Sequence, residues 1–473
     1  MKVLGFDIKR QKRLSRSELE RKVRYYEAAD KGRLGQSFRL ARATGANVEV
    51  AQALPDLRSR SRFMARNNGW AKRGVEAIVK NTVGEGIRPA PLGTPEVNKR
   101  IKEVWRAWAE TTECDWYGKT NLYGLQELMC RSVVEGGDAI AILRKTRTGD
   151  VPIKIQLLEG DFIDHTKNGP NDKGFARLGI QFNKNSELIG YWLFDQHPGE
   201  QSMLLKLNFE SNFHAKENVL HVFEVLRIGQ VRGVPFGVAA FMKMQDFSDY
   251  EEAQLIKQKI ASAYSVFVSN LDSQETKKYE YIESGKINYL AAGETVEFPD
   301  MPAVGDFDGY SVRILQNIAS AFGITYEMLT MDYSKVNFTS GRMAKIDVSA
   351  NFRSWQYNMM APQFCAPVWQ WFMDACLISG ALTQQTAADW TAPRVQQLDP
   401  VKETNARLTA VQAGFTTISE IIREDGRDPD EFFEEYAADM KRLQELGITL
   451  SSVQHAPDIS EQNNNNNEQA QSQ

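Results

Sequence analysis

The sequence predicts an α+β fold, and three of its features lead to that prediction. Apolar side chains recur at helical spacing in stretches before residue 136 and again after residue 233. Residues 136–224 instead hold short segments of alternating apolar and polar side chains, separated by Gly- and Asn-rich turns, which is the pattern of strands. With 473 residues, the chain is long enough to bury a large core.

Residues 1–57 are interpreted as a basic N-terminal arm. Residues 1–73 hold 19 Lys or Arg and 7 Asp or Glu, so they carry a net charge of +12, and the rest of the chain carries −16. A basic segment favours contact with an anionic partner such as nucleic acid, but a solvated basic helix fits the charge equally well. The acidic remainder argues against a protein that grips DNA along its whole surface, because phosphate binding depends on Lys and Arg.

Three helices are expected before the first strand. In the first of them Phe63, Trp70 and Ile78 lie near helical spacing, and Gly84 and Gly86 end the run. The three helices are predicted over residues 58–82, 95–109 and 121–135. The strands that follow are predicted over residues 138–144, 151–157, 178–182, 191–194 and 219–223.

The C-terminal half is dominated by longer helices. Gly233, Val234 and Pro235 introduce a helix that is predicted to run to Ser269, because proline suits a first helical turn. Such a helix would form a rod of roughly 50 Å. Residues 270–306 are predicted to form short segments, with a hairpin at 286–298. Two helices are then predicted at 309–329 and 342–379, separated by a polar loop at 331–341. A strand at 389–398, two helices within 400–446 and a disordered polar tail complete the prediction.

No motif for nucleotide binding, metal binding or covalent catalysis is found in the sequence. The five histidines and four cysteines show no metal-ligand spacing, and the cysteines are expected to be reduced and buried. His221 lies within a predicted strand, where a hydrogen-bonded structural histidine is favoured over a catalytic one. No signal peptide and no membrane span is predicted. The sequence therefore predicts no enzyme, no catalytic residue, no metal and no cofactor.

One local group of carboxylates keeps an alternative open. Glu159, Asp161 and Asp164 follow a predicted strand, and paired carboxylates can act as acid and base or bind a hard cation. In this position they more often cap turns. A metal-dependent nucleic-acid enzyme that uses these three side chains is the alternative, and loss of nuclease activity on Asp161→Ala would be its signature.

Five blocks of the sequence, in order, resemble the lambda-like family of phage portal proteins. They lie between about residues 58 and 378. The blocks are RNNGWAKR at 66–73 with its continuation to Pro89; EGGD at 135–138 leading to QLLEGD at 156–161; VLHVF at 219–223 followed by RIGQVRGVP at 227–235; DYEEAQL at 249–255; and DYS at 332–334 followed by FTSGR at 338–342. The match after residue 378 is looser.

The resemblance implies the portal fold, in which copies of the chain form a ring around a central channel. By order along the chain, it implies a wing at residues 58–232, a first stem helix at 233–269, a clip at 270–306, a second stem helix at 307–330, a channel loop at 331–341, a long helix returning to the wing at 342–398, a helical crown at 399–450 and a tail at 451–473.

The resemblance also implies a function and partners. The implied ring, a dodecamer in this family's pattern, would stand at one capsid vertex of the virion, after assembly in the host cytoplasm. It would pass double-stranded DNA during packaging, retention and ejection. The implied partners are the terminase large subunit, head-tail connector or adaptor proteins, and the major capsid and scaffold proteins; no membrane is implied. A minor capsid protein without a channel is a further alternative.

Two sets of residues are the candidate contact sites. Lys335 is the only basic side chain in the channel loop, so it is expected to meet phosphate, although an ordinary solvent loop is an equally good interpretation. The expected DNA-contact residues are Asp332, Tyr333, Lys335, Asn337 and Ser340. The lysines expected to dock a partner on the clip are Lys277, Lys278 and Lys286.

Overall fold

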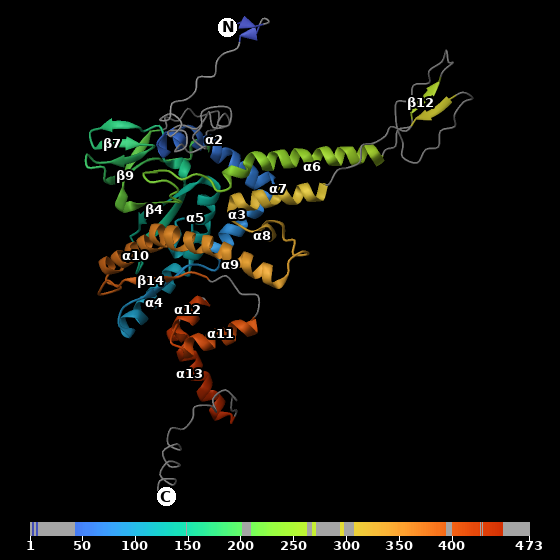
Figure 1. The fold of residues 1–473 in the computed structure, drawn as a ribbon. Coiled ribbons are helices and arrows are strands. Elements are labelled where there is room, and N and C mark those ends of the chain that lie inside the picture. Colours follow the sequence, from blue (N-terminus) through green and yellow to red (C-terminus); the bar gives the residue numbers. More distant parts are fainter. Residues whose placement is uncertain are drawn as a thin grey trace, which may run out of the picture.

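The computed structural model is an α+β protein, as the sequence predicts. It describes residues 2–3, 6–7, 43–147, 149–200, 210–262, 267–270, 294–297, 307–393, 400–425, 427 and 429–447. A body of helices and two sheets carries one helix, α6 (Phe241–Ser262), that projects away from it, and a group of short helices lies on the opposite side of the body (Figure 1). Of the helices in these ranges, none has the length and apolar content that a membrane crossing requires.

The described chain enters the body through two helices, where one was predicted. They are α2 (Ala46–Asn67) and α3 (Gly69–Thr82), and Asn68 separates them because its side chain accepts hydrogen bonds from the backbone N–H groups of Trp70 and Ala71. Helix α2 therefore begins within the segment that was interpreted as the basic N-terminal arm. Val50 and Leu54 are buried against Leu178, so α2 already packs on the body from its first turns.

Two further helices, α4 (Pro95–Ala109) and α5 (Leu122–Gly136), form the helical layer with α3, as predicted to within a few residues. Gly137 ends α5 with a φ of +89°, which favours glycine. A Cβ at this position would lie 2.7 Å from the carbonyl carbon of Val234. Glycine therefore lets the chain turn from α5 into the next strand directly against the segment that leads to α6.

The strands form two main sheets, and the five predicted strands all lie in them. A three-stranded antiparallel sheet has the order β11-β4-β5, and a five-stranded antiparallel sheet has the order β10-β9-β8-β7-β6. The strands are β4 (Asp138–Lys145), β5 (Ile153–Glu159), β6 (Gly169–Asn171), β7 (Gly174–Arg177), β8 (Ile180–Phe182), β9 (Leu188–Phe194), β10 (Ser211–Ala215) and β11 (Val219–Phe223).

Strand β4 is buried on both faces. Because successive side chains of a strand point to opposite sides, its alternate residues enter different cores. Ala139 and Ala141 belong to the large core that the helices share. Ile140 and Ile142 belong to a second core, which lies against the five-stranded sheet. A single strand thus joins the two layers of the body.

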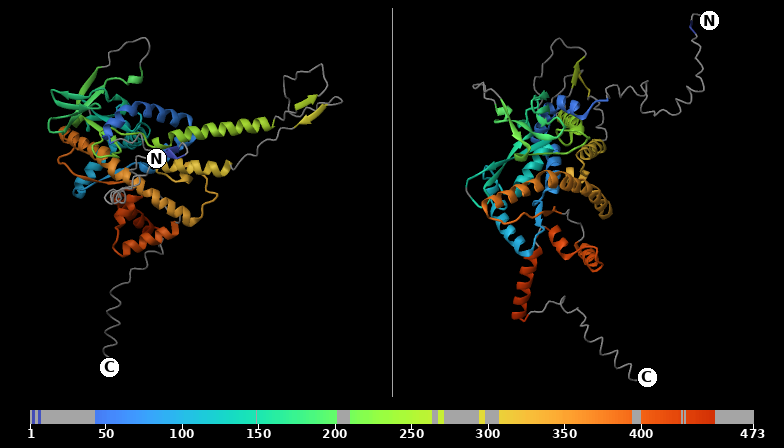
Figure 2. Two further views of the ribbon diagram at one scale, coloured as in Figure 1. Left: turned by 45° about the horizontal axis from the view of Figure 1, so that its top comes forward. Right: turned by 90° about the vertical axis from the view of Figure 1, so that its left-hand side faces the viewer.

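The projecting helix α6 is shorter than predicted. It begins at Phe241, after a 3₁₀ turn at Val238–Ala240, so Pro235 lies in a non-helical segment and not in the first turn of the helix. It ends at Ser262, and β12 (Phe267–Asn270) pairs antiparallel with β13 (Glu294–Glu297) beyond it. Residues 267–269 were predicted as helix, which was wrong. Most of the predicted hairpin at 286–298 lies outside the described residues. The left view of Figure 2 also shows α6 projecting from the body.

The predicted second helix is interrupted once. It consists of α7 (Phe307–Phe322) and α8 (Tyr326–Thr330), with Gly323 at a φ of +68° between them. Helix α7 returns beside α6, where the ring centroid of Tyr250 lies 5.6 Å from that of Phe307 and 4.9 Å from that of Tyr310.

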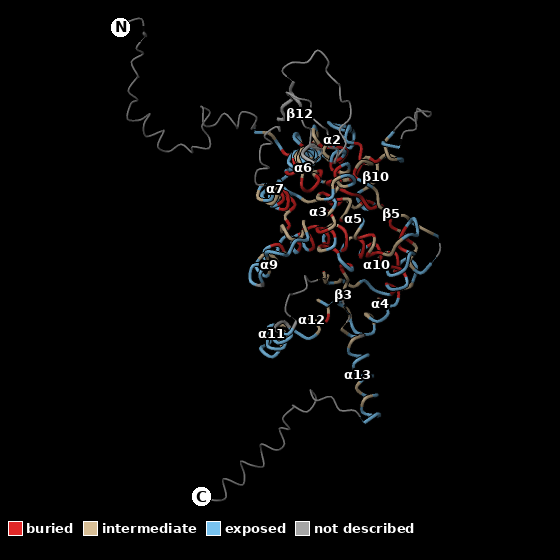
Figure 3. The backbone as a smooth tube through the Cα atoms, turned by 90° about the vertical axis from the view of Figure 1, so that its right-hand side faces the viewer, coloured by how far each residue is buried: buried red, intermediate tan, exposed pale blue. Residues whose placement is uncertain are grey.

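The C-terminal elements differ from their predictions mainly in number. Strand β14 (Ala388–Thr391) pairs with β3 (Arg88–Pro91) and is shorter than predicted; residues 394–399 lie outside the described part. Three helices follow instead of two: α11 (Pro400–Gln412), α12 (Ile418–Glu424) and α13 (Pro429–Glu445). Burial is concentrated in the body, whereas α6, α9, α11 and α13 are largely exposed (Figure 3).

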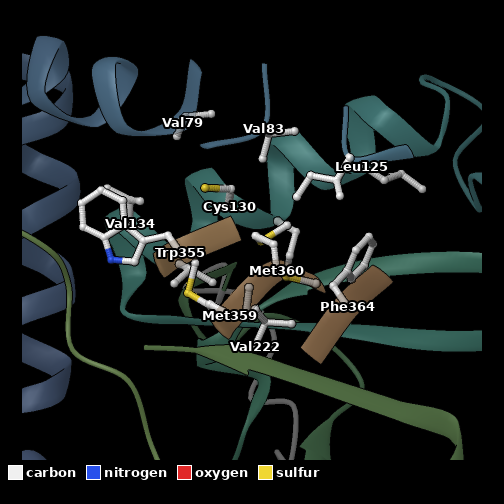
Figure 4. Packing of buried hydrophobic residues seen from close by; sticks show 14 of the residues in the cluster. Val79, Val83, Leu125, Cys130, Val134, Val222, Trp355, Met359, Met360 and Phe364 are labelled. Atoms are coloured by element: carbon white, nitrogen blue, oxygen red, sulfur yellow. The ribbon is translucent and has the colours of Figure 1, made fainter. Parts of the chain in front are cut away.

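A long helical run passes through the body, as predicted, but it begins four residues earlier and changes its winding. It consists of α9 (Phe338–Ser354), eleven π-helical residues at Trp355–Cys365, and α10 (Ala366–Ser379). Pro362 lies in this π-helical segment. In an α-helix, the N–H that proline lacks would leave one backbone hydrogen bond unmade. In Figure 4 this segment packs Met359, Met360 and Phe364 between α5 and β11 at the centre of the core.

Candidate channel loop and subunit-contact surfaces

A buried cluster of charges fixes the mixed region of helices and strands (residues 58–232). Asp138, at the start of β4, accepts hydrogen bonds from Arg58 of α2 and from Arg232, whose Nε lies 2.6 Å from Oδ2. His221 of β11 lies 3.1 Å from the same oxygen. Burial alone would raise the pKa of Asp138, but Arg232 and Arg58 hold it well below its ordinary value. Asp138 therefore stays charged.

The predicted structural role of His221 is confirmed. Its ring contacts Asp138, and burial lowers its pKa. The three partners Arg58, Asp138 and Arg232 were not identified as a cluster from the sequence. The available signal was the spacing of Arg58 and Arg62, one helical turn apart.

The carboxylates Glu159, Asp161 and Asp164 do not form one site. Arg62 Nη2 lies 2.9 Å from Glu159 Oε2 and 2.6 Å from Asp161 Oδ2. Asp164 points elsewhere and accepts hydrogen bonds from Thr166 and Ser211. His197 joins Glu159 and Asp161 instead, so that these three could offer ligand atoms within 4.8 Å of one another.

An arginine already serves as the cation of this group. Arg62 contacts both Glu159 and Asp161, and Arg58 lies 3.8 Å from Asp161. Although burial raises the pKa of Asp161, the two arginines lower it below its usual value. Glu159 and Asp161 thus join the end of β5 to α2 through the arginines. The expected turn-capping role fits Asp164.

The polar loop before α9 is shorter than predicted. It covers residues 331–337, because α9 begins at Phe338. Asn337 and Ser340 form a capping box at the start of α9: the Asn337 side chain accepts from the Ser340 N–H, and Ser340 Oγ accepts from the Asn337 N–H. These two side chains thus have a local structural role.

The other three residues of the predicted contact set are exposed. Asp332 accepts a hydrogen bond from the Ser334 N–H at 2.9 Å, and contact with Ser334 lowers its pKa. Tyr333 and Lys335 lie at the surface of the same loop. The loop therefore presents one phenol and one ammonium group to solvent, beside a fixed carboxylate. The clip lysines Lys277, Lys278 and Lys286 lie outside the described residues.

Apolar side chains remain uncovered on the helices that leave the body. On α6, Met244 and Phe247 near its start are buried, whereas Leu255 and Ile256 further along are exposed. On α9, Met343 is 62 % and Ile346 is 59 % exposed. Stripes of this kind normally pack on a neighbouring element, and no such element is present among the described residues.

The three C-terminal helices carry almost no core of their own. Ile422 is the one buried side chain that the described residues of α11, α12 and α13 contain. Helices of 13, 7 and 17 residues take most of their stability from tertiary packing and little from their own propensity. Val401 and Leu408 of α11, however, are 71 % and 56 % exposed, and Phe415 between α11 and α12 is 87 % exposed.

The comparisons with known proteins identify the class. A family model described as "Phage portal protein, lambda family" matches residues 31–356. A protein of Halomonas phage phiHAP-1 described as "Probable portal protein" is 23 % identical over 465 residues, covering 90 % of this chain and 88 % of that protein. Portal protein B of Escherichia phage lambda is 20 % identical over 458 residues, covering 82 % of this chain and 84 % of its own length.

The solved structures that match this chain include chains of gene transfer agent particles. A chain in the neck of an empty particle matches with a TM-score of 0.48 and 15 % identity, covering 79 % of this chain and 94 % of that one. A chain in the neck of a native particle, computed with C12 symmetry, matches with a TM-score of 0.47 and 13 % identity, covering 78 % and 94 %.

The family match covers more than half of the chain. This protein belongs to the lambda family of phage portal proteins, and its function is that of a portal protein.

Proposed function

We propose that the chain closes with identical copies into a ring of twelve subunits that stands at one capsid vertex of the virion and conducts double-stranded DNA. The ring forms in the host cytoplasm, serves packaging, retention and ejection of the genome, and has no catalytic role of its own. The terminase large subunit docks on it during packaging, and head-tail connector proteins do so later. Major capsid and scaffold proteins surround it.

The exposed apolar side chains are the observation that best supports the proposed ring. The C-terminal helices and the outer parts of α6 and α9 expose side chains that, when buried, each stabilise by about 1.5 to 3 kcal/mol. Several separate elements of one chain need partners at once, and a neighbouring copy on each side supplies them. Head-to-tail contacts of this kind generate rings when their rotation closes.

The charge distribution supports a conduit for DNA. The chain after residue 73 carries −16, so a wall built from it repels phosphates and keeps a duplex from binding along its length. A few cations at the narrowest point then make transient contacts. The loop at residues 331–337 offers such a contact in Lys335, with Tyr333 beside it.

The channel contact is tested with Lys335→Glu in packaged heads. The repulsion between Glu and phosphate is expected to reduce the fraction of filled heads that retain DNA, because a cation that meets the backbone is replaced by an anion. Lys184→Glu, which makes the same change in an exposed turn of the mixed region, is the control. Equal retention in both variants and the wild type contradicts the contact but leaves the ring proposal standing.

The clip is proposed to be the docking surface for the packaging motor and later the tail, with Lys277, Lys278 and Lys286 as contact residues. This proposal rests on the order of segments in the family and on the clustering of the lysines in sequence. Replacing all three by Ser is expected to weaken binding of the terminase large subunit without changing ring size, as a pull-down and electron microscopy of the same preparation measure.

A further inference from the structure

The loop at residues 225–229, which follows β11, exposes three apolar side chains. Val225 and Leu226 are each more than half exposed, and Ile228 is fully exposed. None of the three belongs to a core cluster of the described residues. Single apolar residues on a surface are ordinary, but three within four positions gather apolar surface in one place, as contact surfaces do.

This loop is held in one conformation by the residues that follow it. Gln230 is buried, and its Oε1 accepts hydrogen bonds from the N–H groups of Leu226 and Arg227 at 3.0 and 3.1 Å. Its Nε2 donates to the carbonyl oxygen of Arg232 at 2.8 Å. Gly229 has a φ of +79°, which favours glycine. Because the loop is ordered before anything binds, packing against it would cost little further conformational entropy.

The start of α2 is bound to the same loop. Asn47 Nδ2 donates to the carbonyl oxygen of Gly229 at 2.8 Å, and Asn47 Oδ1 accepts from the N–H of Val231 at 2.9 Å. Arg227 Nη2 donates to the carbonyl oxygen of Thr44 at 3.0 Å, one residue after the described range 43–147 begins. The chain before residue 43 is therefore joined to the body directly beside the loop.

The segment that precedes Thr44 supplies apolar side chains of its own. Leu34, Phe38 and Leu40 lie four to ten residues before Thr44, in a part of the chain outside the described residues. An extended chain spans at most about 3.6 Å per residue, so Leu40 lies within about 14 Å of Thr44 and Phe38 within about 22 Å. A segment tethered at so short a distance has an effective concentration of about millimolar, which favours it over a separate chain as the partner of the loop.

We propose that residues 34–42 pack on the 225–229 loop of their own chain, with Phe38 and Leu40 against Leu226 and Ile228. The contact covers the exposed apolar side chains of the loop. It also fixes the point from which the basic residues earlier in the chain extend, and so sets which partners they can reach. The contact lies within one chain and does not depend on the ring.

Limited digestion of the full-length protein with trypsin tests the contact. Packing on the loop should protect the peptide bonds after Arg39 and Arg42, because a protease cleaves a packed segment only when it opens. Ile228→Asp places a charge in the contact, so cleavage at these bonds should become about tenfold faster. Ile378→Asp makes the same change at another largely exposed isoleucine, near the end of α10, and should leave the rate unchanged. Equal rates in the wild type and Ile228→Asp would overturn the proposal.

Photo-crosslinking from position 228 identifies what covers the loop. The full-length protein with p-benzoylphenylalanine in place of Ile228 is irradiated as a mixture of isotope-labelled and unlabelled chains, and the crosslinked peptides are identified by mass spectrometry. The expected crosslinks join position 228 to residues 34–42, with both peptides carrying the same label. Crosslinks between labelled and unlabelled chains, crosslinks to another segment only, or none at all would contradict the assignment.

Discussion

Asp138 joins parts of the chain that are far apart in sequence. Its carboxylate contacts Arg58 from α2, His221 from β11 and Arg232 from the segment before α6, all of them buried. A buried charge is tolerable only when it is paired and hydrogen-bonded, and removing one partner leaves the others without compensation. The cluster also requires a glycine at position 160, because a Cβ there would collide with the side chains of Asp138 and Arg58.

Asp138→Asn is therefore expected to destabilise the protein by about 3 to 5 kcal/mol, because two buried arginines lose their counter-charge. Urea unfolding followed by tryptophan fluorescence measures the change. Asp172→Asn, an exposed aspartate between β6 and β7, should change the free energy of unfolding by less than about 0.5 kcal/mol. An equally small effect at Asp138 would contradict the account of the cluster.

The same carboxylate gives a pH dependence of known sign. Its folded-state pKa lies well below the ordinary value of 3.8. Its contribution is therefore fully present above that ordinary value and is lost as pH falls towards the folded pKa. The difference in stability between the wild type and Asp138→Asn should not decrease between pH 7 and about pH 5, because Asp138 also raises the pKa of His221, which burial lowers, and it should shrink below about pH 4. A difference that already shrinks between pH 7 and pH 5 would show that Asp138 is not the group responsible.

At the scale of elements, the described residues of one chain leave apolar side chains of the C-terminal helices exposed. Leu408 of α11 is exposed in the single chain, so Leu408→Asp should leave the fold of the monomer intact while it prevents packing against a neighbour. We expect smaller assemblies by mass photometry and unchanged helicity by circular dichroism. Asn405→Asp adds the same charge to the same helix and should assemble normally; a wild-type assembly in Leu408→Asp would argue against α11 as a contact surface.

Much of the element order could be predicted from the sequence, because periodicity reports which side chains are buried. The five strands and most helices lie where alternation or helical spacing placed them. Breaks inside helices were missed at Asn68 and Gly323, because a single capping residue or glycine does not interrupt an apolar pattern. Pro235 was assigned to a helix start, since proline is equally compatible with the extended segment that actually contains it.

The candidate contact residues were predictable only in part. Asn337 and Ser340 are short polar residues in a polar stretch, and only the geometry shows that they cap α9. The cluster around Asp138 depends on contacts between residues about 80 to 95 positions apart, which spacing along the chain does not encode. Of the three carboxylates grouped from the sequence, Glu159 and Asp161 lie together and Asp164 points elsewhere. Arg62 reaches the first two from another helix, which their spacing does not reveal.

At the scale of the whole molecule, the charge distribution and the exposed apolar side chains both fit the proposed ring. The helices that expose apolar side chains in the described part of the chain lie on different sides of the body, as neighbours in a ring require. The acidic majority of the chain suits a wall that does not bind a passing duplex. The family match places the protein among portal proteins, and the ring is how such a chain would become a channel.

Electron microscopy of the purified full-length protein tests this central claim most directly. The account predicts closed rings of twelve subunits with one central hole wide enough for a duplex. Monomers that persist under assembly conditions, or closed particles that lack a central hole, as a minor capsid protein would form, would contradict it.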